Sequence, residues 1–264
     1  MNVAGRTVLL TGATGGLGHA IARAAAARGA RLTLTGRRAD RLDPLAEELD
    51  ARALPCDLGD PEDLDRLVAE AGDVDVLIAN AALPASGALQ SFSVAEIDRA
   101  LAVNLRAPMV LARRLGEAMA ARGSGHLVFV SSMAGKAASP GSAVYSATKF
   151  GLRGFALGLR EDLRDAGVGV STVFPGFISD AGMFADSGVQ LPGYVGTRTS
   201  HQLAEAVIGA VERNRAEVDV APLSVRAGAA VAGLAPELTA RLQRRLGSEQ
   251  VSADLAEAQR DMRS

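Results

Sequence analysis

The chain of 264 residues contains no tryptophan, a single cysteine and only two tyrosines. The lone cysteine, Cys56, excludes an internal disulfide, so the sequence fits a reducing cytoplasm, where we expect the protein to be located. No run approaches the roughly twenty apolar residues that a membrane-spanning helix needs. A net charge of −2 indicates neither a nucleic acid nor an anionic membrane as a partner. Because a strand is predicted from residue 6 onward, we also expect no signal peptide.

Lysine is as scarce as tyrosine. The 28 basic residues include only two lysines, and one of them, Lys149, stands four residues after Tyr145. Four residues is about one helical turn, so both side chains share one face of the predicted helix. A phenol with an ordinary pKa of about 10 accepts protons poorly at neutral pH unless a cation stabilises the phenolate. The pair therefore predicts a general acid and base, although an ordinary surface pair on a helix has the same spacing.

A glycine-rich turn near the N-terminus lies between a predicted strand and a predicted helix. The apolar run from Arg6 to Thr11 leads into Gly-Ala-Thr-Gly-Gly-Leu-Gly, and residues 20–28 are rich in helix formers. Glycines let the backbone approach a pyrophosphate, whose charge is attracted by the amides and dipole at a helix start. A tight turn alone would also require glycine, but the position between strand and helix favours dinucleotide binding. The candidate contacts are Gly12, Thr14, Gly16, Leu17 and Gly18.

Over roughly residues 5 to 221, the sequence resembles the short-chain dehydrogenase/reductase family in its single-domain form. The family pattern Thr-Gly-x-x-x-Gly-x-Gly is matched from Thr11, and the Tyr-x-x-x-Lys motif is matched by Tyr145 and Lys149. The family's serine lies thirteen residues before the tyrosine, where this chain has Ser132. Its asparagine, in the helix after the fourth strand, corresponds to Asn104.

The resemblance implies an oxidoreductase that transfers a hydride between NADP(H) and a carbonyl or secondary alcohol without a metal ion. Tyr145 would give or take the proton, while Lys149 would lower the pKa of that phenol and bind the nicotinamide ribose. Ser132 would orient and polarise the substrate, and Asn104 would hold a water that connects Lys149 to solvent. Without their motif positions, Ser132 would fit a turn serine and Asn104 a satisfied polar group of a helix.

The choice of cofactor is expected just after the second predicted strand, at residues 31–35. An acidic side chain at this place would hold the adenosine ribose of NAD, but Gly36-Arg37-Arg38 follows instead. A guanidinium can pair with a 2′-phosphate, so we predict NADP, with Arg37 as the contact and NAD as the alternative cofactor. In the other interpretation, the two arginines open the next helix as solvated charges.

The resemblance places further cofactor contacts after later strands. Asp57 matches the family position that meets the adenine amino group, and the family's Asn-Asn-Ala-Gly motif appears as Ala79-Asn80-Ala81-Ala82. The family's Pro-Gly after the sixth strand is also present. The remaining expected contacts are therefore Leu58, Asn80, Pro175, Gly176 and Ile178.

Seven predicted strands alternate with helical segments, near residues 6–11, 31–35, 52–55, 74–79, 125–131, 168–174 and 217–220. This alternation predicts an α/β fold with a doubly wound parallel sheet and helices on both faces, the Rossmann fold. Ligands of such sheets bind at the carboxyl ends of the strands, where the proposed site residues emerge. We assign residues 1–224 to one dehydrogenase domain and residues 225–264 to a helical C-terminal extension.

A segment at residues 177–200 departs from this core and is expected to cover the substrate. Its apolar side chains include Phe177, Phe184 and Tyr194, which predict a substrate with a hydrophobic body; a mobile loop that packs on itself would have a similar composition. Lys136 is expected to be a solvated loop lysine, with an anionic group of the substrate as its alternative partner.

The C-terminal extension carries Arg241, Arg244 and Arg245 among leucines. We expect it to pack on the parent domain or on a sister subunit, with a membrane-surface or partner-docking role as the alternative. Members of the family are usually oligomeric through helices that flank the sheet. The resemblance therefore implies a homo-oligomer, with a tetramer ahead of a dimer.

Two other functions compete with the enzymatic one. A non-catalytic dinucleotide sensor or scaffold would use the same fold, because fold alone does not imply chemistry. Such a protein would be expected to lose the tyrosine or the lysine, whereas this chain keeps both. A sugar-nucleotide epimerase or dehydratase would share the pair, but it usually needs a larger C-terminal domain than about forty residues provide.

Overall fold

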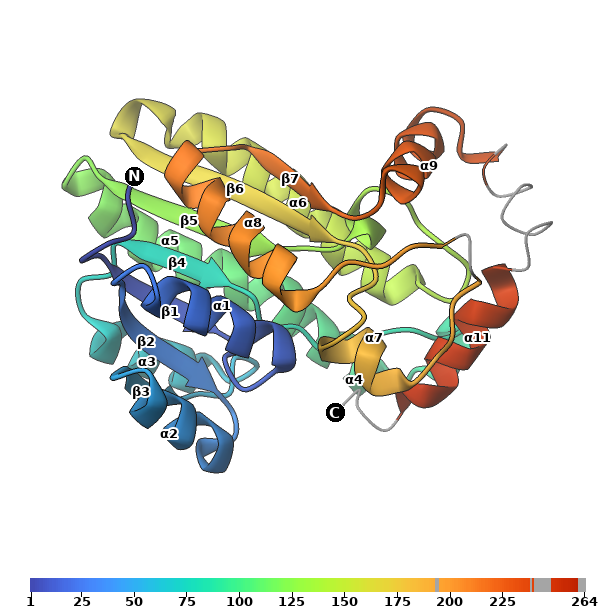
Figure 1. Ribbon diagram of the computed structural model, residues 1–264, viewed down its shortest axis with the longest axis horizontal. Coiled ribbons are helices and arrows are strands. Elements are labelled where there is room, and N and C mark those ends of the chain that lie inside the picture. The colour runs from blue at the N-terminus through green and yellow to red at the C-terminus, as the bar shows by residue number, and fades with distance from the viewer. Residues whose placement is uncertain (193–194, 238, 240–247, 261–264) are drawn as a thin grey trace.

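The computed structural model describes residues 1–192, 195–237, 239 and 248–260. Seven parallel strands form one sheet in the order β3-β2-β1-β4-β5-β6-β7 (Figure 1). Each predicted strand lies within two residues of an observed one, so the predicted doubly wound α/β fold is confirmed. The strands are β1 (Thr7–Thr11), β2 (Arg31–Gly36), β3 (Arg52–Pro55), β4 (Val76–Ala79), β5 (Gly125–Val130), β6 (Val168–Pro175) and β7 (Glu217–Val220).

The central strands are apolar along their whole length because the sheet is buried on both faces. Successive side chains of a strand point to opposite faces, so each strand contributes to two hydrophobic cores. In β1, Val8 belongs to one core and Leu9 to the other. In β5, Val128 and Phe129 divide in the same way. This double burial explains why the sequence shows continuous apolar runs in place of alternation.

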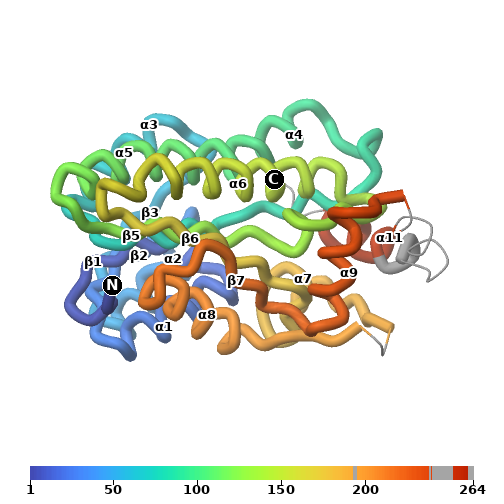
Figure 2. The backbone as a smooth tube through the Cα atoms, turned by 90° about the horizontal axis from the view of Figure 1, so that it is seen from above, coloured from blue at the N-terminus to red at the C-terminus, as the bar shows by residue number. Residues whose placement is uncertain are grey.

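Helices cover both faces of the sheet (Figure 2). One layer consists of α1 (Gly16–Ala26), α2 (Ala39–Glu48) and α8 (Ser200–Arg213), and the other of α3 (Pro61–Ala71), α4 (Val94–Leu101), α5 (Ala107–Ala121) and α6 (Ala143–Asp162). Short 3-10 turns occur at Leu89–Ser91, Met133–Gly135 and Arg164–Ala166, and a π-helical turn occurs at Ala102–Arg106. The strands therefore leave only their ends open, and their carboxyl ends are the edge where ligands of such sheets bind.

Three further helices lie beyond the carboxyl ends of the strands (Figure 1): α7 (Gly182–Ser187), α9 (Leu223–Leu234) and α11 (Ser248–Ala258). The predicted boundary between residues 224 and 225 falls inside α9, and the division into a domain and an extension stays a prediction. The predictions for Tyr194, Arg241, Arg244 and Arg245 lie outside the described residues.

Cys56 is 3% exposed and packs in the core on the α3 side of the sheet. Burial raises the pKa of its thiol to about 12, and the nearby Asp63 carboxylate acts in the same direction. Cys56 therefore packs as a small apolar residue of the core. Within the described part of the chain, no helix combines the length and the hydropathy needed to cross a lipid bilayer.

Candidate active site

The turn between β1 and α1 brings three backbone segments so close together that side chains would not fit. Gly12 has a φ of +68°, and a Cβ atom on it would lie 2.7 Å from the Cα of Ala81. A Cβ on Gly16 would lie 2.8 Å from the Cβ of Ala181, and one on Gly18 would collide with the carbonyl oxygen of Gly12. Gly15 precedes α1 and has no side chain to cap its first amides. The turn thus fits a pyrophosphate.

Asn80 joins the end of β4 to this turn. Its side-chain Nδ2 donates to the carbonyl oxygens of Thr11 at 3.1 Å and Gly12 at 3.3 Å. The Thr11 hydroxyl accepts from the backbone amides of Asn80 and Ala81, each at 3.1 Å. Asn80 therefore holds the glycine turn in position through hydrogen bonds that the Asn-Asn-Ala-Gly motif alone did not reveal.

The end of β2 meets the same turn. A Cβ on Gly36 would lie 2.9 Å from the side chain of Thr14, so the glycine turn and the segment that begins with Arg37 are adjacent. Arg37 and Arg38 are exposed, and the positive charge of Arg37 reaches Asp57. This arrangement places a guanidinium beside the edge where the adenosine end of a dinucleotide would lie.

Asp57 follows β3 and is engaged with other residues of the protein. Arg99 donates from Nη2 to both of its carboxylate oxygens, at 2.7 and 2.8 Å, and the Gly59 amide donates to Oδ1 at 2.9 Å. Burial acts to raise the pKa of Asp57, but these two donors outweigh it and hold the pKa below its ordinary value. Leu58 packs in the core beside α3. The predicted contact with the adenine of a cofactor stays a prediction for both residues.

Tyr145 and Ser132 meet at the carboxyl end of β5. Ser132 precedes the 3-10 turn Met133–Gly135, and its hydroxyl accepts from the Ala134 amide at 3.1 Å. Its side chain also acts on the phenol of Tyr145, whose pKa it tends to lower. Ser131 points elsewhere, since its hydroxyl donates to the carbonyl oxygen of Lys149 at 3.2 Å. Of the two neighbouring serines, Ser132 is the one in contact with the tyrosine.

Lys149 lies one turn further along α6 and is 1% exposed. Its Nζ donates to the carbonyl oxygen of Val130, the last residue of β5, at 3.2 Å. The same nitrogen lies 5.5 Å from the centroid of the Tyr145 ring. Burial disfavours the ammonium and lowers the pKa of Lys149 to about 8. The four-residue spacing therefore does bring both side chains to one place.

The predicted direction of the Tyr145 pKa is wrong for the protein by itself. Burial raises the pKa of the phenol to about 12, and the opposing effect of the Ser132 side chain is smaller. Lys149, whose Nζ lies 5.5 Å from the centroid of the phenol ring, does not reverse this effect. Tyr145 is consequently a protonated phenol at neutral pH, which suits it to donate a proton.

Asn104 is fully buried in the π-helical turn Ala102–Arg106. Its Nδ2 donates to the carbonyl oxygen of Leu83 at 2.9 Å, and its Oδ1 accepts from the Leu83 amide at 2.6 Å. The side chain thus clamps the segment that follows β4, which the sequence did not indicate. The predicted water relay to Lys149 stays a prediction.

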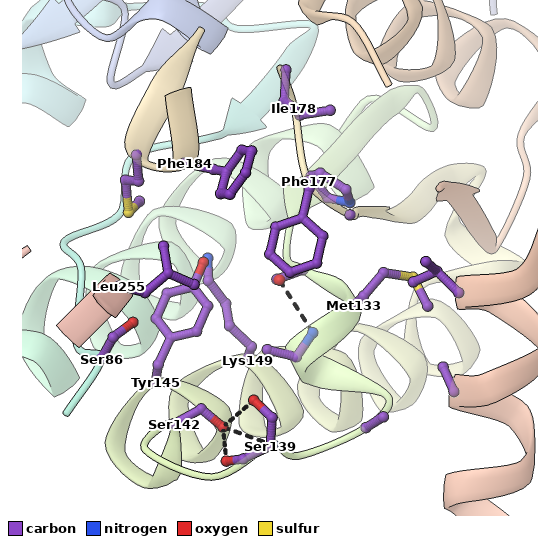
Figure 3. A pocket seen from close by; sticks show the side chains of 18 of the residues that line it. Ser86, Met133, Ser139, Ser142, Tyr145, Lys149, Phe177, Ile178, Phe184 and Leu255 are labelled. Carbon is purple, nitrogen blue, oxygen red and sulfur yellow. Dashed lines mark hydrogen bonds between the residues drawn. The ribbon is translucent and has the colours of Figure 1, made fainter. Parts of the chain in front are cut away.

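A cavity of about 630 Å³ opens above these residues. Tyr145 and Lys149 face Phe177 and Phe184 across it, and the two aromatic rings pack with centroids 4.9 Å apart (Figure 3). Of the predicted site residues, the cavity is lined by Leu17, Asn80, Ser132, Tyr145, Lys149, Pro175, Gly176 and Ile178. Residues 177–192 and the C-terminal segment provide most of the apolar wall, and the second of these contributions had no clear signal in the sequence.

Lys136 has neither of its predicted environments. Its Nζ lies 2.6 Å from a carboxylate oxygen of Asp219 and 3.0 Å from one of Glu217, and it sits 4.1 Å from the centroid of the Phe174 ring. The expectation of a solvated loop lysine is wrong because β7 places two carboxylates beside the turn that follows Ser132. Lys136 anchors that turn to the sheet.

Comparison with protein families gives a match to the model described as short chain dehydrogenase over residues 6–191. The chain belongs to the short-chain dehydrogenase family. A curated relative, the ketoacyl reductase HetN of Nostoc sp. (strain PCC 7120 / SAG 25.82 / UTEX 2576), is 38% identical over 82% of this chain and 78% of its own length. The short-chain dehydrogenase is therefore an oxidoreductase that acts on CH–OH or C=O groups, and the sensor and epimerase alternatives are not retained.

Solved structures of the family agree with this fold. A short-chain dehydrogenase from Sphingobium yanoikuyae in complex with NADPH superimposes with a TM-score of 0.77 and 29% identity, over 88% of this chain and 95% of the other. A bulky-bulky ketone specific alcohol dehydrogenase from Comamonas testosteroni gives a TM-score of 0.74 and 27% identity, over 90% of this chain and 95% of the other. Among the described residues, no three His, Cys, Asp or Glu side chains are grouped so as to hold a metal ion.

Replacement of Lys149 by methionine is expected to stabilise the fold at pH 7 by about 3 kcal/mol. The pKa of Lys149 falls from its ordinary 10.5 in the unfolded chain to about 8 in the folded protein. Between these values the unfolded chain binds more protons, so the wild-type protein gains stability as the pH rises and the advantage of Lys149→Met shrinks toward pH 10. Urea unfolding of both proteins at pH 7 and pH 10 measures this difference.

Lys136→Met provides the matched control, since it removes the only other lysine. It removes one of the two cations beside each of Glu217 and Asp219, which keep Arg153 and Arg226, so it is expected to destabilise the protein at pH 7. A Lys149→Met protein that is less stable than the wild type at pH 7 would contradict the assignment of a costly buried ammonium.

Proposed function

We propose that the protein transfers a hydride between NADP(H) and a ketone or secondary alcohol with an apolar body, with Tyr145 as the general acid and base. The observation that carries this proposal is that Tyr145, Ser132 and Lys149 line one largely apolar cavity, with Lys149 one helical turn from Tyr145. The printed names of the relatives, a ketoacyl reductase and a bulky-bulky ketone specific alcohol dehydrogenase, support this class of substrate.

The residues divide the work at the substrate oxygen. Bound NADP(H) supplies or accepts the hydride. Tyr145 donates its proton to the carbonyl oxygen in the reductive direction, and Ser132 donates a hydrogen bond where negative charge develops on that oxygen. Because the phenol is protonated at neutral pH in the protein by itself, its starting state suits reduction more than oxidation. Lys149, whose ammonium is charged below a pH of about 8, stabilises the phenolate that proton transfer leaves.

The residues present also favour a dinucleotide with a 2′-phosphate. The glycine turn offers free amides at the start of α1, and Gly36 and Thr14 bring this turn against the segment that carries Arg37. The neighbouring structure from Sphingobium yanoikuyae was solved with NADPH, which agrees with this choice. In this proposal, Arg37 pairs with the 2′-phosphate, and Asp57 and Leu58 lie beside the adenine. A cytoplasmic location stays a prediction.

We further propose that the enzyme is a homo-oligomer that associates through the exposed face of α6 and α5. Phe150 and Leu157, two turns apart on α6, are each 41% exposed, and Met109 on α5 is 38% exposed. A Cβ added to Gly154, between the first two, would meet nothing within 4 Å. An apolar, open face of this kind is typical of a subunit contact.

Replacement of Tyr145 by phenylalanine is expected to lower kcat for ketone reduction by about a hundredfold to ten-thousandfold, the usual contribution of a positioned general acid. The dissociation constant for NADPH should change by less than about threefold, because the phenol hydroxyl is a small part of the cofactor site. Absorbance of NADPH measures the rate, and calorimetric titration measures binding. Unchanged turnover in the variant would remove Tyr145 from the reaction.

Ser132→Ala and Ser131→Ala form a matched pair in the same assay. Loss of the Ser132 hydroxyl is expected to lower kcat by at least about tenfold through the lost hydrogen bond to the developing oxyanion. Loss of the Ser131 hydroxyl, which is directed at the Lys149 carbonyl, should change kcat by only a few fold. Equal losses in both variants would argue against a direct role for Ser132.

Arg37→Ala is expected to raise KM for NADPH by about ten- to a hundredfold, since hydrogen bonds to charged groups contribute about 1.5–3 kcal/mol. KM for NADH should change little, because NADH has no 2′-phosphate. Arg38→Ala, at the exposed residue that precedes α2, serves as the control and should leave both KM values near those of the wild type. Parallel changes with both cofactors would show that Arg37 does not read the phosphate.

The double variant Phe150→Glu and Leu157→Glu is expected to convert the oligomer into a smaller species, because it places charges in an apolar contact. Light scattering coupled to size-exclusion chromatography measures the mass. Leu223→Glu, at a side chain that is 74% exposed on α9, is the control and should leave the mass unchanged. A wild-type protein that elutes as a monomer would refute the proposal.

A further inference from the structure

The C-terminal segment forms part of the wall of the catalytic cavity. Side chains from α9 and α11 line the cavity that also contains Tyr145, Ser132 and Lys149. The contributors from this segment are Ser224, Val225, Gly228, Ala229, Thr239, Ser252, Leu255 and Gln259. Leu255 and Tyr145 both project into this space (Figure 3). The tail is thus placed where it contacts a bound substrate.

Both helices are fixed to the rest of the protein at this position. In α9, Ala229 is 7% exposed and packs in a cluster with Met133, Phe174 and Ala221. At the end of α11, Gln259 is 6% exposed and donates from Nε2 to the carbonyl oxygen of Met183 in α7 at 3.3 Å. Ser252, at the other end, lies against Gly141 in the loop before α6. Both helices are therefore held in place as parts of the cavity wall.

The chemistry of the lining restricts what can be bound. Among the described residues that line the cavity, Lys149 is the only charged one, and the tail contributes apolar groups, hydroxyls and the Gln259 carboxamide. An ionised group placed against the tail would lose its hydration without gaining a partner of opposite charge there. The cavity is consequently suited to an uncharged apolar body, with hydroxyls available for an occasional polar substituent.

We propose that the C-terminal segment, through Leu255 of α11 and the Gly228 surface of α9, sets the size of the apolar body that the enzyme accepts. This inference rests on the proposed reduction of ketones, which it deepens by assigning specificity to a segment outside residues 6–191, where the family match lies. Leu255 limits the cavity on one side. Gly228 leaves room on the other, because a Cβ atom placed on it would meet nothing within 4 Å.

Two variants with opposite effects on the cavity test the inference. Gly228→Leu adds a side chain to the cavity, and leucine is favoured over glycine in a helix, so the fold is not put at risk. It is expected to reduce kcat/KM for the bulkiest ketones of a homologous series by at least about tenfold and to affect the smallest ones little. Leu255→Ala enlarges the cavity and is expected to shift the optimum of the series toward larger ketones.

Each variant has a matched control in the same segment. Gly233→Leu places the same side chain on an exposed residue of α9 with open space around it, and Leu234→Ala truncates a leucine that is 89% exposed. Both controls should show the same dependence of kcat/KM on ketone size as the wild type. A ketone whose terminal methyl group is replaced by a carboxylate should be at least about tenfold poorer than its neutral counterpart in the wild type.

The outcomes separate this inference from the proposed function. Suppose the wild type reduces ketones, but in Gly228→Leu and Leu255→Ala the kcat/KM values depend on ketone size as in the wild type or change by the same factor for every ketone. The inference is then wrong, and the proposed function stands. If the wild type binds NADPH but reduces no ketone and oxidises no secondary alcohol, the proposed function is wrong and the inference falls with it. Calorimetric titration with the bulkiest alcohol should show weaker binding in Gly228→Leu, independently of turnover, and equal binding would also overturn the inference.

Discussion

The ammonium of Lys149 is held almost completely away from water, with its Nζ bonded to the carbonyl oxygen at the end of β5. A charge in this environment is unfavourable for folding, and the lowered pKa of the side chain expresses that cost. The same low exposure makes its field on a neighbouring phenolate stronger than it would be in water. The site therefore depends on a destabilising burial, which is a common compromise between stability and activity.

Around this charge, hydrogen bonds fix the backbone at the carboxyl ends of neighbouring strands. Asn80 and Thr11 join the end of β4 to the glycine turn, and Asn104 clamps the segment after β4 at Leu83. Lys136 anchors the turn that follows Ser132 to the two carboxylates of β7. Each of these polar groups is satisfied by the protein itself, so the loops can approach a ligand closely without large rearrangement.

The apolar half of the cavity is built differently. It comes from residues 177–192 and from the C-terminal helices α9 and α11, which lie beyond the carboxyl ends of the strands. Variation there changes the shape of the cavity and leaves the strands, Tyr145 and Lys149 in place. Such a division lets one scaffold serve different substrates, and in this chain it separates the polar residues of α6 and of the strand ends from the apolar wall of the added segments.

The sequence by itself determined the local features of this protein. Apolar runs separated by helical segments gave the strands to within two residues, and the glycine turn and the Tyr145–Lys149 spacing were evident because they depend only on chain geometry over one or two turns. Leu255 as a cavity residue, the carboxylate partners of Lys136 and the clamp of Asn104 on Leu83 were decided only by the tertiary structure. Each joins segments far apart in the chain, and no local pattern encodes such a contact. The direction of the Tyr145 pKa belongs to the same group, because it reflects how much protein surrounds the phenol and not which residue lies four positions away.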